Sequence, residues 1–334
     1  MKRVVIALLA LSGLIFFTTA AYFSVSYFRF IEEPMASPQS FDYEVKRGSN
    51  VRSIAADLVQ RGWLDDDLFL RVLARHQALT EVKIGLYAFA EAPTPKVFLQ
   101  RINSGKVKQF SITFPEGWTY RQWLDELARH PKISKTLPSD VPYQEHMELL
   151  GSSYTHPEGW FFPETYFYQE GTSDLEILQR AHEKMQDFLQ AAWESNPLPL
   201  PLENPYQVLT LASIIEKETG APHERAAIAG VFMRRLERNM RLETDPTVIY
   251  GIGESFDGNI TRKHLRTPTP YNTYVIKGLP PTPIAMPSAA AILAVFLPEE
   301  DDTLFFVSKG DGTHHFSATL DEHNRAVRQY QLKK

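Results

Sequence analysis

Residues 205–219 read PYQVLTLASIIEKET, and from this stretch to the C-terminus the sequence is dense in residues that could carry chemistry. Its apolar residues recur at three- and four-residue intervals, which is the spacing of an amphipathic helix. Pro205 suits the first turn of a helix, and Gly220 suits the position just past its end. The sequence therefore predicts one helix over residues 205–219 with a buried aliphatic face.

The helical geometry separates two acidic residues of this stretch. At about 100° per residue, Glu218 falls within the apolar arc that contains Ile214, whereas Glu216 falls toward the edge of that arc. Burial among aliphatic side chains raises the pKa of a carboxyl group, and the negative end of the helix dipole acts in the same direction. Glycosidic bond cleavage requires such an acid, because the leaving oxygen must be protonated. The alternative role for Glu218 is a structural ion pair with Arg234 or Arg235.

Two segments downstream offer chemical groups that bind sugars. Residues 242–251 read LETDPTVIYG, and Pro246 predicts a non-helical conformation at Asp245. Residues 266–274 read RTPTPYNTY, a proline-braced loop with tyrosine, asparagine and threonine side chains. Turn capping and a purely structural loop are the alternative roles of these residues. The two segments therefore supply candidates for substrate contact.

The N-terminal segment predicts a membrane anchor. Residues 4–28 contain no charged residue, and as a helix they rise about 37 Å, which exceeds the ~30 Å hydrocarbon core of a bilayer. Lys2 and Arg3 precede this run, which favours a cytoplasmic N-terminus with the remaining chain on the outer side. The alternative is a signal peptide cleaved near residues 19–21, but the apolar run is longer than the roughly 7–15 residues typical of such peptides.

Composition narrows the chemistry further. The chain has 334 residues, no cysteine and a formal net charge of −5. These features exclude disulfides, thiolate metal sites and cysteine nucleophiles, and they argue against nucleic acid as a partner. The sequence contains no glycine-rich phosphate loop, nucleophile elbow or HExxH motif, so we expect no cofactor. His314, His315 and His323 lack the spacing of metal ligands, so we expect no metal site.

Pattern and composition divide the chain into four segments. Residues 1–30 form a cytoplasmic stub and transmembrane anchor, residues 31–40 a linker, residues 41–109 a small module and residues 110–334 the main domain. Within the small module, a strand, a glycine turn and an amphipathic helix begin a pattern that recurs at an offset of 69 residues. This module resembles a LysM-type module, a small βααβ fold that binds N-acetylated glycans. A relative of that module that does not bind glycan is the alternative.

Several longer motifs resemble one family. They are residues 212–219 (ASIIEKET), 242–251 (LETDPTVIYG), 269–274 (TPYNTY) and 278–281 (GLPP), the aromatic segment 158–168, and the pairs His315-Phe316 and His323-Asn324. Together they resemble the YceG-like family, the endolytic murein transglycosylases called MltG, over nearly the whole chain. The linker and residues 137–157 match least.

The resemblance implies a fold, an activity and a location. The fold would be α+β, with a single N-terminal transmembrane helix, a LysM-like βααβ module, and a mixed α+β catalytic domain that contains a lysozyme-like catalytic helix. The family cleaves peptidoglycan glycan strands internally, between MurNAc and GlcNAc, without water, and leaves 1,6-anhydro-MurNAc ends. The protein would lie in the cell inner membrane with its catalytic domain in the periplasm. There it would terminate nascent strands beside cell-wall synthases, the penicillin-binding proteins.

The catalytic glutamate of the family corresponds to Glu218. In this interpretation Glu218 protonates the glycosidic oxygen and then, as a base, takes the proton of the sugar's own C6 hydroxyl. Further candidates for substrate contact are Asp245, Thr247, Tyr250, Tyr271 and Asn272, with Glu164 and Trp160 on the groove wall. One alternative is a hydrolytic muramidase, in which Asp245 or Glu216 would be the second carboxylate. The other alternative is a non-catalytic glycan-binding scaffold of cell-wall synthases.

Overall fold

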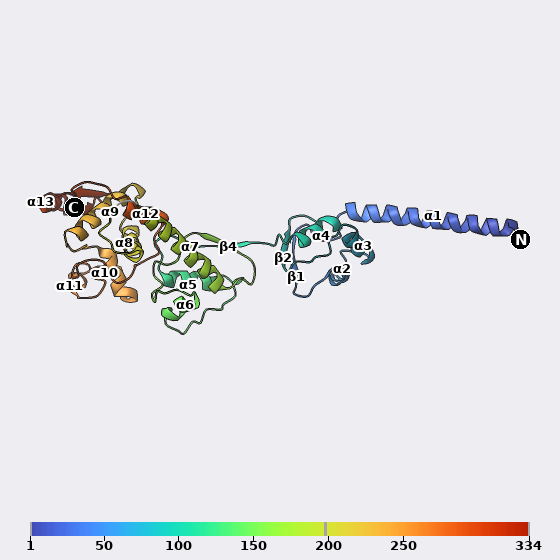
Figure 1. The fold of residues 1–334 in the computed structure, drawn as a ribbon, viewed down its shortest axis with the longest axis horizontal. Helices are drawn as coiled ribbons and strands as arrows, with labels where there is room; N and C mark the ends of the chain where they lie inside the picture. The colour runs from blue at the N-terminus through green and yellow to red at the C-terminus, as the bar shows by residue number, and fades with distance from the viewer. Residues whose placement is uncertain (1, 197–198, 333–334) are drawn as a thin grey trace. The chain divides into compact units, whose positions relative to one another are not determined.

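The structure is a computed structural model that describes residues 2–196 and 199–332. It has the mixed α+β composition that the sequence predicts, with helices in the majority. Contacts between Cα atoms divide the chain into two compact units (Figure 1). Unit 1 comprises Met1–Phe110 and Tyr168–Glu170, and unit 2 comprises Ser111–Phe167 and Gly171–Lys334.

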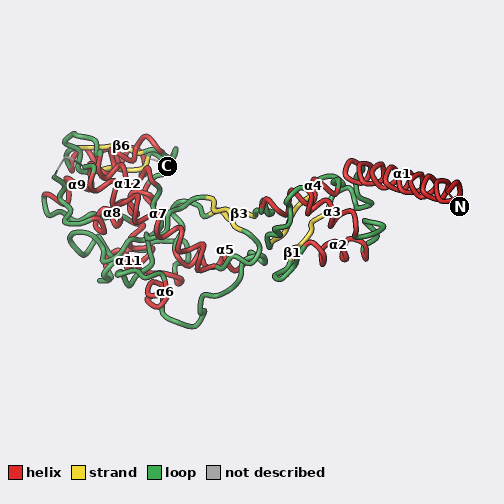
Figure 2. Tube along the Cα trace, turned by 45° about the vertical axis from the view of Figure 1, so that its right-hand side comes forward, coloured by secondary structure: helices red, strands yellow, loops and turns green. Residues whose placement is uncertain are grey.

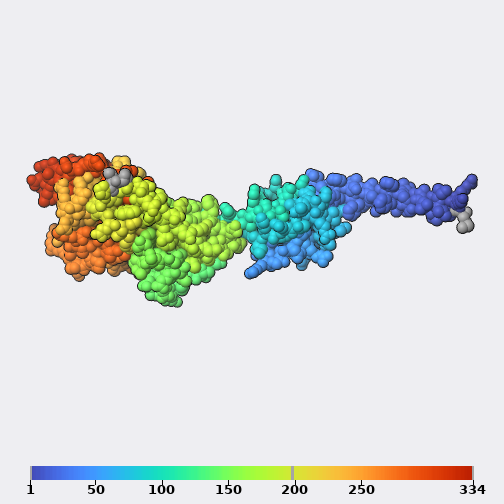
Figure 3. Space-filling model, in the orientation of Figure 1, coloured from blue at the N-terminus to red at the C-terminus, as the bar shows by residue number. Residues whose placement is uncertain are grey.

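Helix α1 spans Lys2–Glu32 and begins unit 1. Among the described residues it is the one helix that is long and apolar enough to cross a membrane. Its large side chains are exposed from Val4 to Val25, in the part drawn as an uncovered blue helix in Figure 3. Ile31, near the end of the helix, is buried in the core of unit 1. The predicted apolar segment is therefore one continuous helix whose last turns belong to a folded unit.

The rest of unit 1 follows the predicted strand–helix–helix–strand order. Its elements are β1 (Phe41–Val45), α2 (Val51–Gln60), α3 (Leu68–His76), β2 (Gly85–Phe89) and α4 (Pro95–Ser104). The two strands pair antiparallel, with Phe41 opposite Phe89 and Val45 opposite Gly85. Because side chains alternate along a strand, one face of the pair is buried against the helices, with Tyr87 at its centre.

The predicted internal repeat is present. Helix α5 spans Tyr120–Arg129, against Val51–Gln60 for α2, so the offset of 69 residues holds at both ends. Asn50 and Thr119 cap the two helices, and each forms a capping box with the residue three positions later. A glycine with positive φ precedes each cap, Gly48 at 86° and Gly117 at 72°, where a residue with a Cβ would be strained.

Unit 2 is built around helix α8, which spans Pro205–Glu218. Its other helices are α5, α6 (Tyr143–Leu149), α7 (Asp174–Glu194), α9 (Arg225–Glu237), α10 (Asp245–Ile252), α11 (Arg262–Arg266), α12 (Ala289–Phe296) and α13 (Leu320–Tyr330). Helices α7, α9, α10 and α12 contact α8. Figure 2 shows α7, α9 and α12 in the same part of the molecule as α8. The middle of α8 is consequently buried on every side, so only its ends can present side chains to a ligand.

Two further strand pairs complete the fold. Strand β3 (Phe110–Thr113) pairs with β4 (Thr165–Tyr168), and β5 (Phe305–Ser308) pairs antiparallel with β6 (His314–Ser317). The second pair is a hairpin whose turn contains Gly310 and Gly312, both at positive φ, and α13 packs on it.

The non-helical conformation predicted for Asp245 is wrong. Thr244 is extended, and α10 begins at Asp245 with Pro246 in its first turn. The first-turn N–H groups of a helix have no intrahelical partner, so the missing N–H of a proline costs nothing there. The extended residue therefore lies one position earlier than the local sequence rule predicts.

Candidate active site

Glu218 is the last helical residue of α8, where the buried helix reaches the surface of unit 2. Leu211, Ile214 and Ile215 on the preceding turns have no exposed surface, which confirms the aliphatic surroundings that the helical geometry predicts. Thr219 is extended and ends the helix. Glu218 itself is partly exposed, so its carboxyl group can meet a ligand from an otherwise apolar position.

One side chain among the described residues hydrogen-bonds the Glu218 carboxyl group. Thr244 Oγ1 donates to Glu218 Oε2 at a distance of 2.8 Å. The alternative of an ion pair with Arg234 or Arg235 is wrong, because both guanidinium groups bind backbone carbonyls of other segments. Within the described part of the chain, Oε1 of Glu218 is therefore left to interact with a ligand.

Burial raises the pKa of Glu218 to about 7. The neighbouring charge of Asp245 acts in the same direction, whereas the hydrogen bond from Thr244 and the charge of His314 lower the pKa. The direction agrees with the prediction from the helical geometry. A carboxyl group with a pKa near neutrality can both donate and accept a proton at physiological pH, which is the requirement for a general acid and base.

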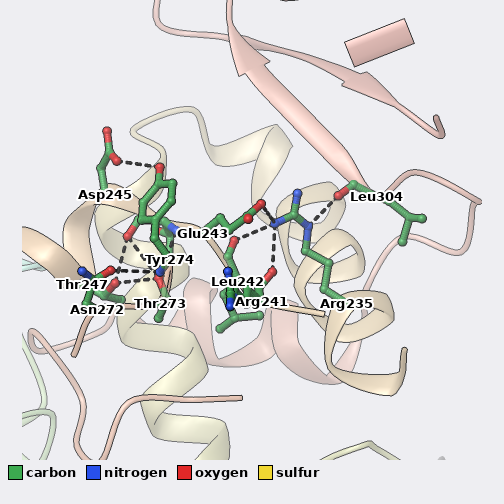
Figure 4. Close-up of polar contacts among 11 residues, drawn as sticks. Arg235, Arg241, Leu242, Glu243, Asp245, Thr247, Asn272, Thr273, Tyr274 and Leu304 are labelled. Carbon is green, nitrogen blue, oxygen red and sulfur yellow. Dashed lines mark hydrogen bonds and ion pairs between the residues drawn. The ribbon is translucent and has the colours of Figure 1, made fainter. Parts of the chain in front are cut away.

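Thr244 is held in place by two other threonines. Its backbone N–H donates to Thr273 Oγ1 at 3.1 Å, and Thr247 Oγ1 donates to its carbonyl at 2.8 Å. The hydroxyl oxygens of Thr247 and Thr273 lie 2.8 Å apart. Figure 4 shows these two side chains together. All three residues are buried. This network fixes the backbone at residue 244, so that its own hydroxyl points at Glu218.

Arg235 of α9 holds the segment that leads into Thr244 (Figure 4). Its Nε donates to the carbonyl of Leu304 at 2.7 Å, and its Nη1 donates to the carbonyls of Arg241 and Leu242 at 3.0 and 2.9 Å. Nη1 also lies 3.3 Å from the Glu243 carboxylate. Glu243 has a φ of 52°, a strained value for a residue with a Cβ, and Arg235 supplies contacts that keep the segment in this conformation.

Asp245 lies beside Glu218 on the exposed side of the site. The Tyr274 hydroxyl donates to Asp245 Oδ1 at 2.7 Å (Figure 4). Burial, followed by this hydrogen bond, raises the pKa of Tyr274 above its ordinary value, so the phenol remains protonated and keeps donating at neutral pH. The site thus places the oriented carboxylate of Asp245 next to the Glu218 carboxyl group.

Tyr250 and Tyr271 also come together. Their ring centroids lie 5.0 Å apart. The Tyr250 hydroxyl donates to Glu158 Oε2 at 3.0 Å, and the Tyr271 hydroxyl shares a 2.8 Å hydrogen bond with Thr282. Both tyrosines are partly exposed, so they can offer ring surface to a sugar while their hydroxyl groups are held by the protein.

The remaining residues that the sequence predicts to contact substrate bond to, or pack against, other groups of the protein. Thr247 and Asn272 are buried, and the Asn272 amide donates to two backbone carbonyls. Trp160 is also buried and stacks on a neighbouring tyrosine ring. Glu164 is partly exposed and forms an ion pair with Lys184. Thr247, Asn272 and Trp160 therefore lie below the surface of the protein.

Glu158 is a buried carboxyl group for which the sequence predicts no separate role. It accepts hydrogen bonds from the Tyr120 backbone N–H at 2.9 Å and from the Tyr250 hydroxyl at 3.0 Å. Burial raises the pKa of Glu158 to about 7, although both hydrogen bonds and the charge of Lys217 lower it. Glu158 thus connects Tyr250 to the N-terminus of α5. The only signal in the sequence is an acidic residue at the start of an aromatic segment.

Replacing Glu158 with glutamine is expected to make stability less dependent on pH. The pKa of Glu158 is higher in the folded state than its ordinary value of 4.5, so the folded state binds more protons between about pH 4.5 and 7 and loses stability as pH rises through that interval. The wild-type protein should therefore lose about 3 kcal/mol relative to E158Q by pH 8. Thermal unfolding of both proteins at pH 4.5 and 8 measures this difference. Parallel pH dependence in the two proteins would contradict the buried carboxyl group as its source.

The Glu216 carboxylate is bonded to other groups of the protein. Its Oε2 accepts hydrogen bonds from the backbone N–H of Ser288, at 3.0 Å, and from the Ser288 hydroxyl. Arg225 Nη2 lies 3.7 Å from its Oε1. Because Ser288 is the N-cap of α12, Glu216 connects the end of α8 to the start of a second core helix.

The histidines do not form a metal-ligand group with neighbouring acids. His314 pairs with Glu224, with 2.7 Å between Nδ1 and Oε2, and His323 stacks on Phe305. Within residues 2–196 and 199–332, no group of three or more His, Asp and Glu side chains is arranged to hold a metal ion.

Comparisons with known proteins give consistent matches. The YceG-like family model matches residues 43–329. A Bacillus subtilis (strain 168) protein named endolytic murein transglycosylase is 29% identical over 310 residues, which cover 88% of this chain and 86% of that protein. A Streptococcus pneumoniae (strain ATCC BAA-255 / R6) protein of the same name is 25% identical over 321 residues, which cover 86% of this chain and 57% of that protein. The match thus takes in little more than half of the length of the pneumococcal protein.

A solved structure shares the fold. The 2.6 Å crystal structure of a YceG-like protein from Listeria monocytogenes is 29% identical in sequence and aligns with a TM-score of 0.52. The alignment covers 87% of this chain and 100% of that chain. The family match, moreover, spans most of both units. The chain therefore belongs to the YceG-like family.

Proposed function

We propose that this protein is a lytic transglycosylase that cleaves peptidoglycan glycan strands internally. The observation that carries the proposal is the Glu218 carboxyl group, whose pKa burial raises to about 7 and whose Oε2 accepts the Thr244 hydroxyl. Such a group suits both proton transfers of glycosidic bond cleavage. The relatives named endolytic murein transglycosylases support peptidoglycan as the substrate class.

The proposed reaction uses one carboxyl group twice. Glu218 donates its proton to the oxygen between MurNAc and GlcNAc, the bond from C1 of MurNAc to that oxygen breaks, and positive charge spreads over C1 and the ring oxygen. The Glu218 carboxylate then removes the proton of the C6 hydroxyl of the same MurNAc, whose oxygen bonds to C1 and closes the 1,6-anhydro ring. Glu218 ends protonated again, and no water is consumed.

Thr244 and Asp245 support the two protonation states of Glu218. The Thr244 hydroxyl occupies Oε2, which leaves Oε1 to exchange protons with the substrate. The charge of Asp245 favours the protonated form of Glu218 before cleavage and the cationic sugar during cleavage. The Tyr274 hydroxyl holds the Asp245 carboxylate in position. Tyr250 and Tyr271 are the proposed stacking surface for a neighbouring sugar.

A hydrolytic muramidase is the second candidate function. A glycoside hydrolase of the usual kind needs two carboxyl groups. The position of Asp245, exposed beside Glu218, is the observation that favours this alternative. Glu216, the other acid that the sequence offers, is bonded to Ser288 and Arg225. Any hydrolytic mechanism here would therefore depend on Asp245.

Product analysis separates these functions. Purified peptidoglycan is incubated with the full-length protein in detergent micelles, and the fragments are identified by liquid chromatography and mass spectrometry. Anhydro ends, which are lighter by one water than reducing ends, are the expected result. Reducing ends would identify a muramidase instead. Retention of glycan strands without any cleavage would support the non-catalytic scaffold.

The location and the partners are part of the same proposal. Helix α1 would anchor the protein in the inner membrane, with the N-terminus in the cytoplasm and unit 2 in the periplasm. Residues 41–109 would act as a LysM-like module, and α8 would correspond to the catalytic helix of lysozyme-like enzymes. Cell-wall synthases would be the partners, since an enzyme fixed at the membrane can terminate strands as they are made.

Opposite shifts of the pH profile are expected for Thr244→Val and Asp245→Asn. The hydrogen bond from Thr244 lowers the pKa of Glu218, so its loss moves the fall in activity to higher pH. The charge of Asp245 raises that pKa, so its removal moves the fall to lower pH. T244V should also lower kcat about 10- to 100-fold, the equivalent of one hydrogen bond to a charged group.

The pH dependence of kcat/KM on soluble glycan strands measures both shifts, because it follows ionisations of the free enzyme. Asp302→Asn is the control, since Asp302 is exposed and lies in a different part of unit 2 from Glu218. Its profile should match that of the wild-type protein. Shifts of T244V and D245N in the same direction would contradict the assigned roles.

A further inference from the structure

We propose that the exposed face of helix α3 rests on the outer surface of the membrane and binds the phosphate groups of anionic phospholipids. This inference rests on the proposed transmembrane role of α1. It is independent of the proposed chemistry at Glu218.

Helix α3 crosses α1 where α1 leaves the hydrocarbon core. Twenty helical residues from Val4 rise about 30 Å, so the core ends near Phe23. The Phe69 ring of α3 packs edge-on against Phe23, with 4.9 Å between centroids, and lies 6.0 Å from the ring of Tyr27. At the other end of α3, His76 Nδ1 and the Tyr27 hydroxyl are 3.1 Å apart. Both ends of α3 therefore lie at the level of the lipid headgroups.

The end of α1 fixes unit 1 at this level. Ile31 and Met35 are buried in the same core as the helices and strands of unit 1. The Met35 backbone N–H donates to the carbonyl of Pro93 at 2.9 Å. Since α1 runs without a break into this core, α3 cannot move far from the point where α1 leaves the membrane.

The free face of α3 points toward the bilayer. Around the helix, Phe69 and His76 contact α1, while Leu70, Leu73 and Ala74 are buried in the core. The remaining face consists of Leu68, Arg71, Val72 and Arg75. Because α3 crosses α1 and the core lies on the far side of α3, this face is directed along α1 toward its N-terminal half. Figure 1 shows α3 at the end of unit 1 that is nearest to that half.

The chemistry of this face suits a phospholipid surface. A shallow groove is lined by Arg52, Leu68, Arg71, Val72 and Arg75. We call these five residues the α3 surface. Arg52 and Arg75 are exposed, and neither forms an ion pair within the described residues, whereas Arg71 lies 3.1 Å from Asp67. Guanidinium groups match pairs of phosphate oxygens, and exposed apolar side chains such as Leu68 enter the interfacial region. The α3 surface therefore resembles an interfacial helix in its composition.

Single-cysteine labelling of the full-length protein tests the proposal, because the chain has no cysteine of its own. A fluorescent label is attached in three variants: Leu68→Cys on the α3 surface, Phe16→Cys within α1, and Glu44→Cys on the exposed face of β1. Each protein is reconstituted into liposomes of phosphatidylglycerol and phosphatidylcholine that carry nitroxide-labelled lipids. The measured quantity is the loss of label fluorescence caused by these lipids.

The three labelled positions separate failure of the α3 surface from failure of the membrane anchor. Quenching at residues 16 and 68, but not at residue 44, is the expected result. Quenching at residue 16 alone would overturn the α3 surface while leaving the anchor intact. Absence of quenching at residue 16 would overturn the anchor and the proposal together, and the product analysis of peptidoglycan digests would still stand.

A charge-reversal variant tests the phosphate contacts. Arg52→Glu with Arg75→Glu, in the Leu68→Cys protein, should lose most of the quenching at residue 68 in liposomes that contain phosphatidylglycerol. Both arginines are exposed, so their replacement should leave the fold intact, which circular dichroism checks. Unchanged quenching in the charge-reversed protein would overturn the phosphate contacts.

Discussion

Replacing Glu218 with glutamine is expected to reduce the rate of peptidoglycan cleavage by at least about 10³-fold, the upper part of the range for a general acid or base. Glutamine keeps the shape of the side chain and can still accept the hydrogen bond from Thr244. It cannot donate a proton to the glycosidic oxygen or take one from the C6 hydroxyl. The loss should therefore appear in kcat, with KM little changed, in assays that follow the release of anhydro-ended fragments.

Glu216→Gln is the matched control for this variant. It removes the same charge from the same helix, two residues away, and the glutamine oxygen can still accept from the backbone N–H of Ser288. We expect activity close to that of the wild-type protein. Equal losses in the two variants would point to destabilisation of α8 instead of a role in catalysis, and retained activity in E218Q alone would remove Glu218 from the mechanism.

Replacing Arg235 with methionine is expected to cause the largest loss of stability among the variants considered. Arg235 is 7% exposed and bonds to three backbone carbonyls, those of Leu304, Arg241 and Leu242. Methionine fills a similar volume but leaves these acceptors without a donor. Removing one member of a buried polar network of this kind costs about 3–5 kcal/mol. For a unit of this size the midpoint of thermal unfolding should fall by about 10 °C.

The same variant links stability to the active site. Arg235 holds residues 241–243, which lead into Thr244, so R235M should also lower kcat at temperatures where it remains folded. Arg238→Met is the control, because Arg238 lies on the exposed C-terminal end of the same helix. Differential scanning calorimetry and activity assays measure both effects. An R235M midpoint within the error of that of R238M would contradict the assigned role.

Features of the fold that depend on local pattern were predictable from the sequence. The apolar run at residues 4–28 predicts α1, and the repeated turn and helix pattern predicts α2 and α5. The spacing of apolar residues in α8 also predicts that Glu218 shares a face with buried aliphatic side chains, which is why the direction of its pKa shift could be stated in advance. These predictions succeed because they depend on residues within a few helical turns.

Predictions that needed a partner from elsewhere in the chain were less complete. A proline normally disfavours helical geometry at the residue before it, yet Asp245 begins α10 directly before Pro246 and bonds to Tyr274, 29 positions later. A rule based on neighbouring residues cannot predict how the Asp245 side chain is oriented, because its partner comes from a distant part of the sequence. Asn272 and Thr247 stay predicted sugar contacts, but both side chains are buried in the structure. The Asn272 amide donates to a backbone carbonyl of its own loop, and the Thr247 hydroxyl, in the first turn of α10, donates to the carbonyl of Thr244.

By itself, the sequence determined the anchor-like helix, the repeated module, the central helix and the position of Glu218 on its apolar side. Each of these follows from the pattern of residues within short segments of the chain. Only the tertiary structure decided that Thr244 reaches Glu218, that Arg235 serves the loop instead of Glu218, and that Glu158 is buried beneath Tyr250. The physical reason is that hydrogen-bond partners and burial depend on which distant segments meet, and that is set by packing of the whole chain.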